Sequence, residues 1–257
     1  HLLIDPLTDI AQEIVNLDYH NLSIYDSKKD LIEDINVAGD LYFDNYGVPA
    51  TLHVNGFEIA LKGNLKVQNS TDIISINWGN GTLRHYGDDW KMPKVLEEVH
   101  HLIFEGKGDK TIQNDLLVTG DFIIREEAVG RQGSAGNSAK VTGSLSNSFM
   151  LGDGNIYYIF GENNDVLLPS NFNNYHIHKN STIRLQSATA AETTISTLPT
   201  YGHLYVETSG ETQIQNSGTL KILGDFEERI KDGYSLNDQS VDIEIGGDLY
   251  VSTYLNP

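Results

Sequence analysis

The stretch Val37-Ala38-Gly39-Asp40-Leu41 contains the phrase that decides the fold: an apolar residue, any residue, glycine, a small polar residue and a second apolar residue. It returns 24 residues later as Leu61-Lys62-Gly63-Asn64-Leu65, and further copies are centred on Gly87, Gly120, Gly143, Gly224 and Gly247. Four intervals between neighbouring copies are 24, 24, 23 and 23 residues. Self-similarity at such a period is typical of repeat architectures, in which each unit packs only against its neighbours.

A second phrase, with histidine shortly before leucine, marks larger modules. It reads His20-Asn21-Leu22, His101-Leu102-Ile103 and His203-Leu204-Tyr205. A Gly-Asp phrase follows each copy, with 17 to 20 residues from the leucine to the glycine. Modules therefore begin near residues 20, 101 and 203, and two nested periods are poorly explained by chance.

Alternating apolar and polar residues flank the phrases, as in Leu52-His53-Val54 and Leu65-Lys66-Val67. Period-two alternation over three to six residues, interrupted by Gly, Asn and Asp, predicts many short strands separated by turns. Residues 175–178 and 182–185 are candidates for further strands in the central region, where the repeat is degraded.

Helical and loop-like patterns occur in only a few places. Apolar residues at helical spacing predict a short helix over residues 7–17, within an entry segment of residues 1–18, and a second one over 95–101. Residues 126–140 are rich in Gly, Ser and Glu, so we expect a solvated loop inserted between strands.

A unit of about 23 residues holds two or three short strands, which are too few to enclose a core alone. Stacked units would bury a continuous apolar column, so residues 19–257 are predicted to form an all-β, right-handed parallel β-helix, or solenoid. The Gly-Asp pairs would then form a ladder along one corner, and a Gly120→Val substitution should lower the melting temperature markedly. The alternative is a tandem array of β-sandwich domains, each the size of the 80–100-residue module.

Composition restricts the class of partner. Seventeen Lys and Arg residues against 36 Asp and Glu give a formal net charge of -19, which argues against binding to a nucleic-acid backbone. The absence of cysteine excludes disulfides, thiol catalysis and thiolate metal sites. No run approaches the roughly 18 apolar residues of a membrane-spanning helix.

The repeat strings resemble those of a known group of proteins. His101-Leu102-Ile103-Phe104 with Val118-Thr119-Gly120-Asp121-Phe122, and Thr51-Leu52-His53-Val54 with Lys62-Gly63-Asn64-Leu65, are similar to repeats of very large secreted surface proteins of Bacteroidota. Those proteins are exported by type IX secretion, and some are gliding-motility adhesins. The resemblance covers residues 19–125 and 200–253, and it implies an extracellular fragment of a longer chain.

Nine histidines raise the question of a metal site. His100 and His101 are adjacent, His176 and His178 would share one strand face and could chelate zinc, and His203 repeats the position of His101. The simpler interpretation is a repeated turn that favours histidine at a strand entrance, where it is exposed or caps a carbonyl. On that interpretation the chain holds no metal at these residues.

Calcium is the other candidate ion, because acidic secreted β-proteins often bind hard cations through oxygen ligands. Asp153 and Asn155 lie in one oxygen-rich loop, and Asp165 lies in a second, Glu162-Asn163-Asn164-Asp165. Neither loop has the order of residues of a known calcium motif. Asp and Asn are also the ordinary residues of turns, so no cofactor is expected beyond this calcium candidate.

The most enzyme-like cluster is Asp88-Asp89 beside Trp90, which pairs acids with an aromatic platform for a sugar. The repeat favours a different interpretation, with Trp90 at the core position that Leu or Phe holds elsewhere and Asp88 at the corner. No catalytic residue is therefore predicted. Thirteen tyrosines could line an exposed face that contacts sugars or protein, although Tyr is also a favoured strand residue.

These patterns predict a structural and adhesive protein, not an enzyme. A surface polysaccharide or another cell-surface protein is the expected partner, with secretion or motility machinery as a further one. The rival prediction is a carbohydrate-active β-helix enzyme, such as a polysaccharide lyase or a glycosidase. Thinly spread Lys and Arg residues make recognition of an acidic polysaccharide electrostatically unattractive.

Overall fold

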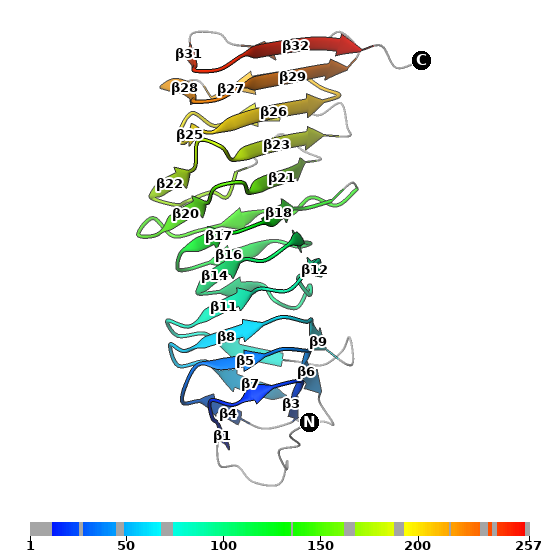
Figure 1. Ribbon diagram of the computed structural model, residues 1–257, viewed down its shortest axis with the longest axis vertical. Coiled ribbons are helices and arrows are strands. Elements are labelled where there is room, and N and C mark those ends of the chain that lie inside the picture. Colours follow the sequence, from blue (N-terminus) through cyan, green and yellow to red (C-terminus); the bar gives the residue numbers. More distant parts are fainter. Residues whose placement is uncertain are drawn as a thin grey trace.

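The chain forms an all-β solenoid of parallel strands, stacked from β1 at one end to β32 at the other (Figure 1). The computed structural model describes residues 12–25, 28–44, 49–67, 74–134, 136–161, 168–187, 193–215, 217–231, 236–237 and 241–254. In this part of the chain, successive strands take a first, a second and a third place in each coil, and strands in the same place pair between coils. The coil of β22 and β23 is the exception, because its described residues form no first-place strand.

The first-place strands form three successive sheets. These comprise β1 (Gln12–Ile14), β4 (Lys28–Leu31), β7 (Ala50–His53) and β10 (Ile74–Asn77), then β13 (Glu98–Val99), β16 (Leu116–Val118) and β19 (Val141–Thr142), and finally β24 (Thr193–Ile195), β27 (Thr212–Ile214) and β30 (Leu236–Asn237).

The second-place strands form one long sheet and one short sheet. The long one, called sheet C here, comprises β2 (Asp18–Tyr19), β5 (Ile35–Val37), β8 (Glu58–Leu61), β11 (Thr82–His85), β14 (His101–Phe104), β17 (Phe122–Ile124), β20 (Ser148–Leu151) and β22 (Asn174–Ile177). The short one comprises β25 (Thr200–Tyr201), β28 (Thr219–Ile222) and β31 (Asp242–Ile245).

The third-place strands begin with β3 (Leu22–Tyr25), β6 (Leu41–Asp44) and β9 (Leu65–Val67). They continue as a second long sheet, called sheet D here, which comprises β12 (Trp90–Lys91), β15 (Gly108–Ile112), β18 (Ala128–Gln132), β21 (Ile156–Gly161), β23 (Thr182–Ser187), β26 (His203–Thr208), β29 (Phe226–Lys231) and β32 (Leu249–Tyr254).

The pairing confirms the solenoid and excludes the sandwich. Every pairing between the strands named above is parallel. A β-sandwich is instead built from antiparallel neighbours. The prediction of tandem β-sandwich domains is therefore wrong for this part of the chain.

Side chains alternate between the interior and the surface, and the interior holds a column of aromatic rings. The ring centroids of Trp90 and Phe104 are 5.9 Å apart, those of Phe104 and Phe122 5.4 Å, and those of Phe122 and Phe149 5.3 Å. Tyr157 continues the column 5.4 Å from Phe149. Edge-to-face pairs at these separations stabilise the stack beyond the burial of their apolar area.

The repeated glycines occupy two corners, so the prediction of a ladder along one corner is wrong. Gly39, Gly63, Gly87, Gly224 and Gly247 lie between second-place and third-place strands. Gly120 and Gly143 instead lie between first-place and second-place strands. At both corners a Cβ atom on the glycine would collide with a neighbouring coil, for example with the Lys62 carbonyl oxygen at Gly87 and with the Phe172 ring at Gly143.

The larger modules do not occupy equivalent places either. The strand of the His101 phrase, β14, belongs to sheet C, whereas that of the His203 phrase, β26, belongs to sheet D. The first module begins at β3, which is also a third-place strand. One phrase is therefore used on two different faces of the solenoid.

Both helix predictions are wrong where the structure describes the residues. Of residues 7–17, Gln12–Ile14 form strand β1, and Ile14 is buried opposite Leu31 of the next coil. Residues 7–11 lie outside the described part. Residues 95–101 contain a turn, β13 and the start of β14. Burial against the neighbouring coil outweighs the local helical spacing in both places.

The expected loop at 126–140 contains a buried strand, β18, so this prediction is also wrong for Ala128–Gln132. Its small interior residues hid the strand from the sequence pattern. A Cβ atom on Gly130 would lie 2.7 Å from the Tyr157 ring, so the glycine makes room for that ring. By contrast, β22 and β23 confirm the strands predicted around 175–178 and 182–185.

Candidate functional site

The repeated histidines act as corner acceptors. His101 Nδ1 accepts a hydrogen bond from the backbone N–H of Asp121 (2.9 Å), and the Asp121 side chain accepts one from the N–H of Ser148 (2.8 Å). His203 Nδ1 likewise accepts from the N–H of Asp225 (3.0 Å). Each side chain thus holds the backbone of the next coil.

The same arrangement occurs without histidine near the start of the described chain. Asn21 Oδ1 accepts from the N–H of Asp40 (2.7 Å), and Asp40 Oδ1 accepts from the N–H of Asn64 (2.7 Å). These chains of acceptors are called corner ladders here. The corner ladders explain why a histidine or asparagine opens each module and why an Asp follows the repeated glycine. The histidines were expected to cap carbonyl groups, but in the structure their side chains accept hydrogen bonds from backbone N–H groups.

The other candidate histidines, His100, His176 and His178, do not gather around a common point. His100 Nδ1 lies 2.9 Å from Thr119 Oγ1, and its ring packs edge-on against His101. His176 is exposed on β22, and His178 Nδ1 lies 3.1 Å from Asp153 Oδ1. In the described part of the chain, no three His, Asp or Glu residues are placed to hold a metal ion.

The calcium candidates are not brought together in the described residues. Asp153 lies in an exposed turn beside His178, with a side chain that is 64% exposed. Asn155 is fully buried, and its side-chain amide has no hydrogen-bond partner. Asp165 lies outside the described residues. The two described candidates therefore face different surroundings, although they are two residues apart.

The Asp88-Asp89-Trp90 cluster is part of the core and a corner. Trp90 is 1% exposed and stacks on the buried His85 ring at 4.5 Å. Asp89 Oδ1 accepts from the N–H of Asp109 (2.8 Å), so Asp89, not Asp88, has the corner role. The buried Lys110 Nζ donates to the carbonyl oxygens of Gly87, Asp88 and Lys107. The core interpretation of Trp90 is confirmed.

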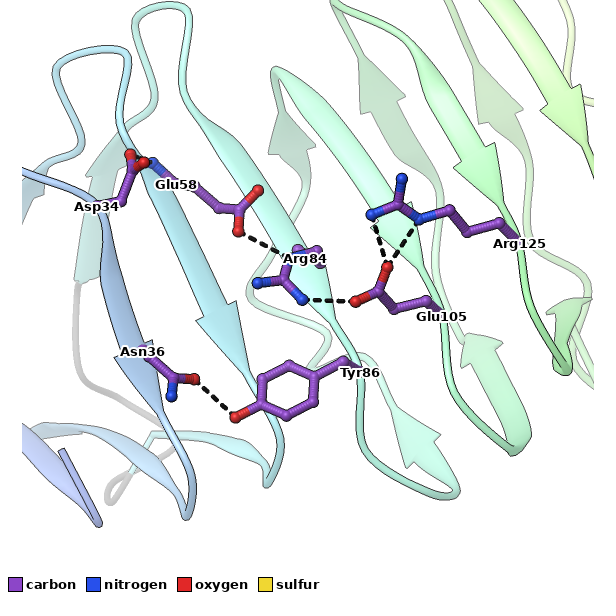
Figure 2. A network of polar contacts seen from close by, with 7 residues as sticks. All are labelled: Asp34, Asn36, Glu58, Arg84, Tyr86, Glu105 and Arg125. Carbon is purple, nitrogen blue, oxygen red and sulfur yellow. Dashed lines mark hydrogen bonds and ion pairs between the residues drawn. The ribbon is translucent and has the colours of Figure 1, made fainter. Parts of the chain in front are cut away.

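Sheet C presents a network of polar contacts on its outer face (Figure 2). Arg84 Nε donates to Glu58 (2.7 Å), and Glu105 accepts from both Arg84 and Arg125. Burial would raise the pKa of Glu105, but the hydrogen bonds from the two arginines outweigh it, and the pKa is lowered. Tyr86 donates to Asn36 (2.6 Å). Because its charges are paired with one another, this network stabilises the coils more than it offers a binding site.

Sheet D presents a second row of polar residues, here called the Arg–Tyr ladder: Arg131, Tyr158, Arg184 and Tyr205. Each is in register with the next, on strands β18, β21, β23 and β26. The guanidinium of Arg131 lies 4.2 Å from the centre of the Tyr158 ring, and that of Arg184 lies 4.5 Å from the Tyr205 ring. Cation–π attraction and the parallel register hold the ladder in one geometry.

Residues at either end of the ladder continue the row. Asp109 pairs with Arg131 (2.6 Å), and Arg229 lies 5.3 Å from the Tyr205 ring while pairing with Glu227 (3.0 Å). Burial and the neighbouring Glu207 carboxylate raise the pKa of Tyr205 to about 12, so its hydroxyl remains a hydrogen-bond donor. That hydroxyl donates to Glu207 (3.1 Å), so the row holds its side chains in a fixed arrangement along one face of the solenoid.

A shallow groove crosses the ladder at its third member. It is lined by Asn180, Thr182, Arg184, His203, Leu204, Tyr205, Asp225 and Glu227. The lining combines a guanidinium, an amide, hydroxyls and carboxylates over a buried leucine. Such a mixture of donors and acceptors is suited to a polar, hydroxyl-rich ligand.

The sequence pattern missed this ladder. Its members are 27, 26 and 21 residues apart, because turns of different length separate the strands of sheet D. The expectation that cations are spread thinly is also wrong for arginine, since three of the five arginines lie on the outer face of this one sheet. The only sequence signal was the abundance of tyrosine in alternating segments.

Beneath the end of the ladder, the interior contains a carboxyl group. Glu228 is 2% exposed, and burial raises its pKa from 4.5 to about 7. The folded state therefore binds a proton that the unfolded state has released between about pH 4.5 and 7, and stability falls as the pH rises through this range.

We expect Glu228→Gln to raise the free energy of unfolding at pH 8 by about 2–3 kcal/mol and to change it little at pH 5. Glutamine keeps the shape of the protonated acid without the cost of a buried charge. Urea unfolding at the two pH values measures the difference. An equal effect at both would contradict a buried, proton-binding Glu228; Glu227→Gln, on the exposed side of the same strand, is the control.

Comparison of the chain with protein-family models, with curated proteins and with solved structures found no match. Within the described residues, the structure contains no helix of the length and hydrophobicity needed to span a membrane. The strand pairing establishes the class of protein: a parallel β-solenoid with an ordered row of arginine and tyrosine on one outer face.

Proposed function

We propose that this chain is a structural and adhesive segment of a large secreted cell-surface protein. In this proposal the solenoid is a rigid extracellular rod, and the Arg–Tyr ladder is the surface that contacts a polysaccharide or another cell-surface protein. The observation that carries the proposal is the fixed row from Arg131 to Tyr205, held by consecutive parallel strands. A rigid row of this kind binds an extended partner without a large loss of conformational entropy.

Two further features support the proposal. The repeat phrases resemble those of secreted Bacteroidota surface proteins, which favours type IX export, a location at the cell surface and a gliding or attachment adhesin. The net charge of -19 disfavours nucleic acid as the partner. Contacts with secretion or motility machinery are compatible with the same location.

Retention of the purified chain on immobilised polysaccharides and on intact bacterial cells tests the proposal. We expect wild-type protein to be retained and Tyr158→Ser to weaken retention about tenfold, because the serine removes a ring that contacts two arginines. Tyr42→Ser is the matched control, since Tyr42 also lies beside a cation, Lys66, but outside the ladder.

Two results would contradict this function. One is wild-type protein that is retained on none of the polysaccharides or cells. The other is the appearance of new reducing ends or unsaturated sugars during the incubation, which would favour the rival carbohydrate-active enzyme.

A further inference from the structure

Within the described residues, four of the five arginines of this chain have a carboxylate partner, and Arg184 does not. Arg84 pairs with Glu58 and Glu105, and Arg125 shares Glu105. Arg131 and Arg229 also have carboxylate partners. Of the residues that the structure describes, none forms an ion pair with Arg184. In a chain with 36 acidic residues, Arg184 is therefore the one arginine without a carboxylate partner among the described residues.

The surroundings of Arg184 hold its guanidinium in place. The Tyr205 ring centre lies 4.5 Å away on one side, and the Tyr158 ring centre lies 5.6 Å away on the other. The Nε atom of Arg184 is buried and has no hydrogen-bond partner. The side chain is thus fixed between two rings without the carboxylate that normally accompanies a partly buried arginine.

The acids that line the same groove already have partners. Asp225 accepts from the backbone N–H of Asp248 (2.9 Å), and Glu227 accepts from Arg229 (3.0 Å). Glu227 is thus paired with a cation, whereas Asp225 keeps its negative charge because its donor is a neutral N–H. This charge disfavours a ligand that carries two negative charges at one point. A single carboxylate fits better, because a guanidinium binds it through two parallel hydrogen bonds.

We propose that the groove over Arg184 binds a carboxylate-bearing sugar, a uronic acid unit of an acidic glycan. The sugar carboxylate would bind Arg184, and Asn180 and Thr182 would contact its hydroxyls. This inference rests on the proposed adhesive function and names its ligand. It also limits the electrostatic argument against acidic polysaccharides, which holds for the whole chain but not for this groove.

Titration calorimetry with a galacturonic acid hexamer and a neutral galactose hexamer tests the site. We expect the acidic hexamer to bind the wild-type chain more tightly and Arg184→Gln to weaken this binding about tenfold, with little change for the neutral one. Arg184→Lys should also weaken it, because lysine keeps the charge but loses the two-pronged geometry. Arg125→Gln is the matched control, since it removes an arginine that follows strand β17 of sheet C and lies outside the groove.

Each outcome decides the question. Equal binding of the two hexamers, unaffected by Arg184→Gln, would overturn this inference and leave the adhesive function with a neutral ligand. Absence of binding to either hexamer would also overturn it, and retention on intact cells then shows whether the adhesive function fails as well. Because Arg184→Lys preserves charge and most of the volume, it separates loss of the site from loss of folding, which thermal melting of each variant monitors.

Discussion

A Gly87→Val chain is expected to melt far below the wild-type chain, with a loss of more than about 4 kcal/mol in the free energy of unfolding. A Cβ atom at Gly87 would lie 1.8 Å from the carbonyl oxygen of Lys62 in the preceding coil. The obstacle is backbone, so no side-chain rotation relieves it, and the two coils must separate at this corner.

Gly120→Val should rank second, because its Cβ would lie 2.8 Å from the His100 carbonyl oxygen and 2.6 Å from His101 Nδ1, which accepts the corner hydrogen bond. Gly56→Ala is the control: Gly56 has a φ of +88° but open space around it, so alanine should cost only about 1 kcal/mol. Thermal and urea unfolding measure all three. Equal melting temperatures of Gly87→Val and Gly56→Ala would contradict a close contact between coils at Gly87.

The second large effect is expected for Phe149→Ala, which should cost about 3–5 kcal/mol. Phe149 is fully buried and contacts the rings of Phe122, Tyr157, Phe172 and Tyr175. Removing its ring leaves a cavity in the middle of the aromatic column, and the parallel strands on both sides limit the collapse that would fill it.

Urea unfolding compares Phe149→Ala with Leu145→Ala, a residue that is 72% exposed in the turn before the same strand. Little change is expected for Leu145→Ala. Similar losses in the two variants would show that the aromatic column contributes no more than an exposed turn, which contradicts the stacked core.

The sequence predicted the fold class because the repeat period matches one coil of the solenoid. It also predicted that Trp90 belongs to the core, since the aligned phrases place Leu or Phe there. It could not predict which corner each glycine occupies. A coil has more than one corner, and a phrase of five residues fits two of them equally well.

The errors have a common physical origin in contacts between coils. The sequence did not reveal strand β18, because Gly130 replaces the apolar residue that would mark a strand. A larger side chain there would collide with the ring of Tyr157, which lies 27 residues further along the chain. The Arg–Tyr ladder escaped for a related reason: turns of unequal length separate its members, so no fixed spacing marks them. The register between strands of neighbouring coils depends on how the coils stack, so the sequence of a single strand does not reveal it.

The direction of the inter-coil hydrogen bonds has a mechanical consequence. These bonds, including the corner ladders, run along the axis that joins β1 to β32 at opposite ends of Figure 1. Tension applied at the two ends therefore detaches one coil at a time. Each coil that peels away replaces a rise of about 4.8 Å with about 80 Å of extended chain. A solenoid that detaches in this way would lengthen by many times the height of the coils that it loses.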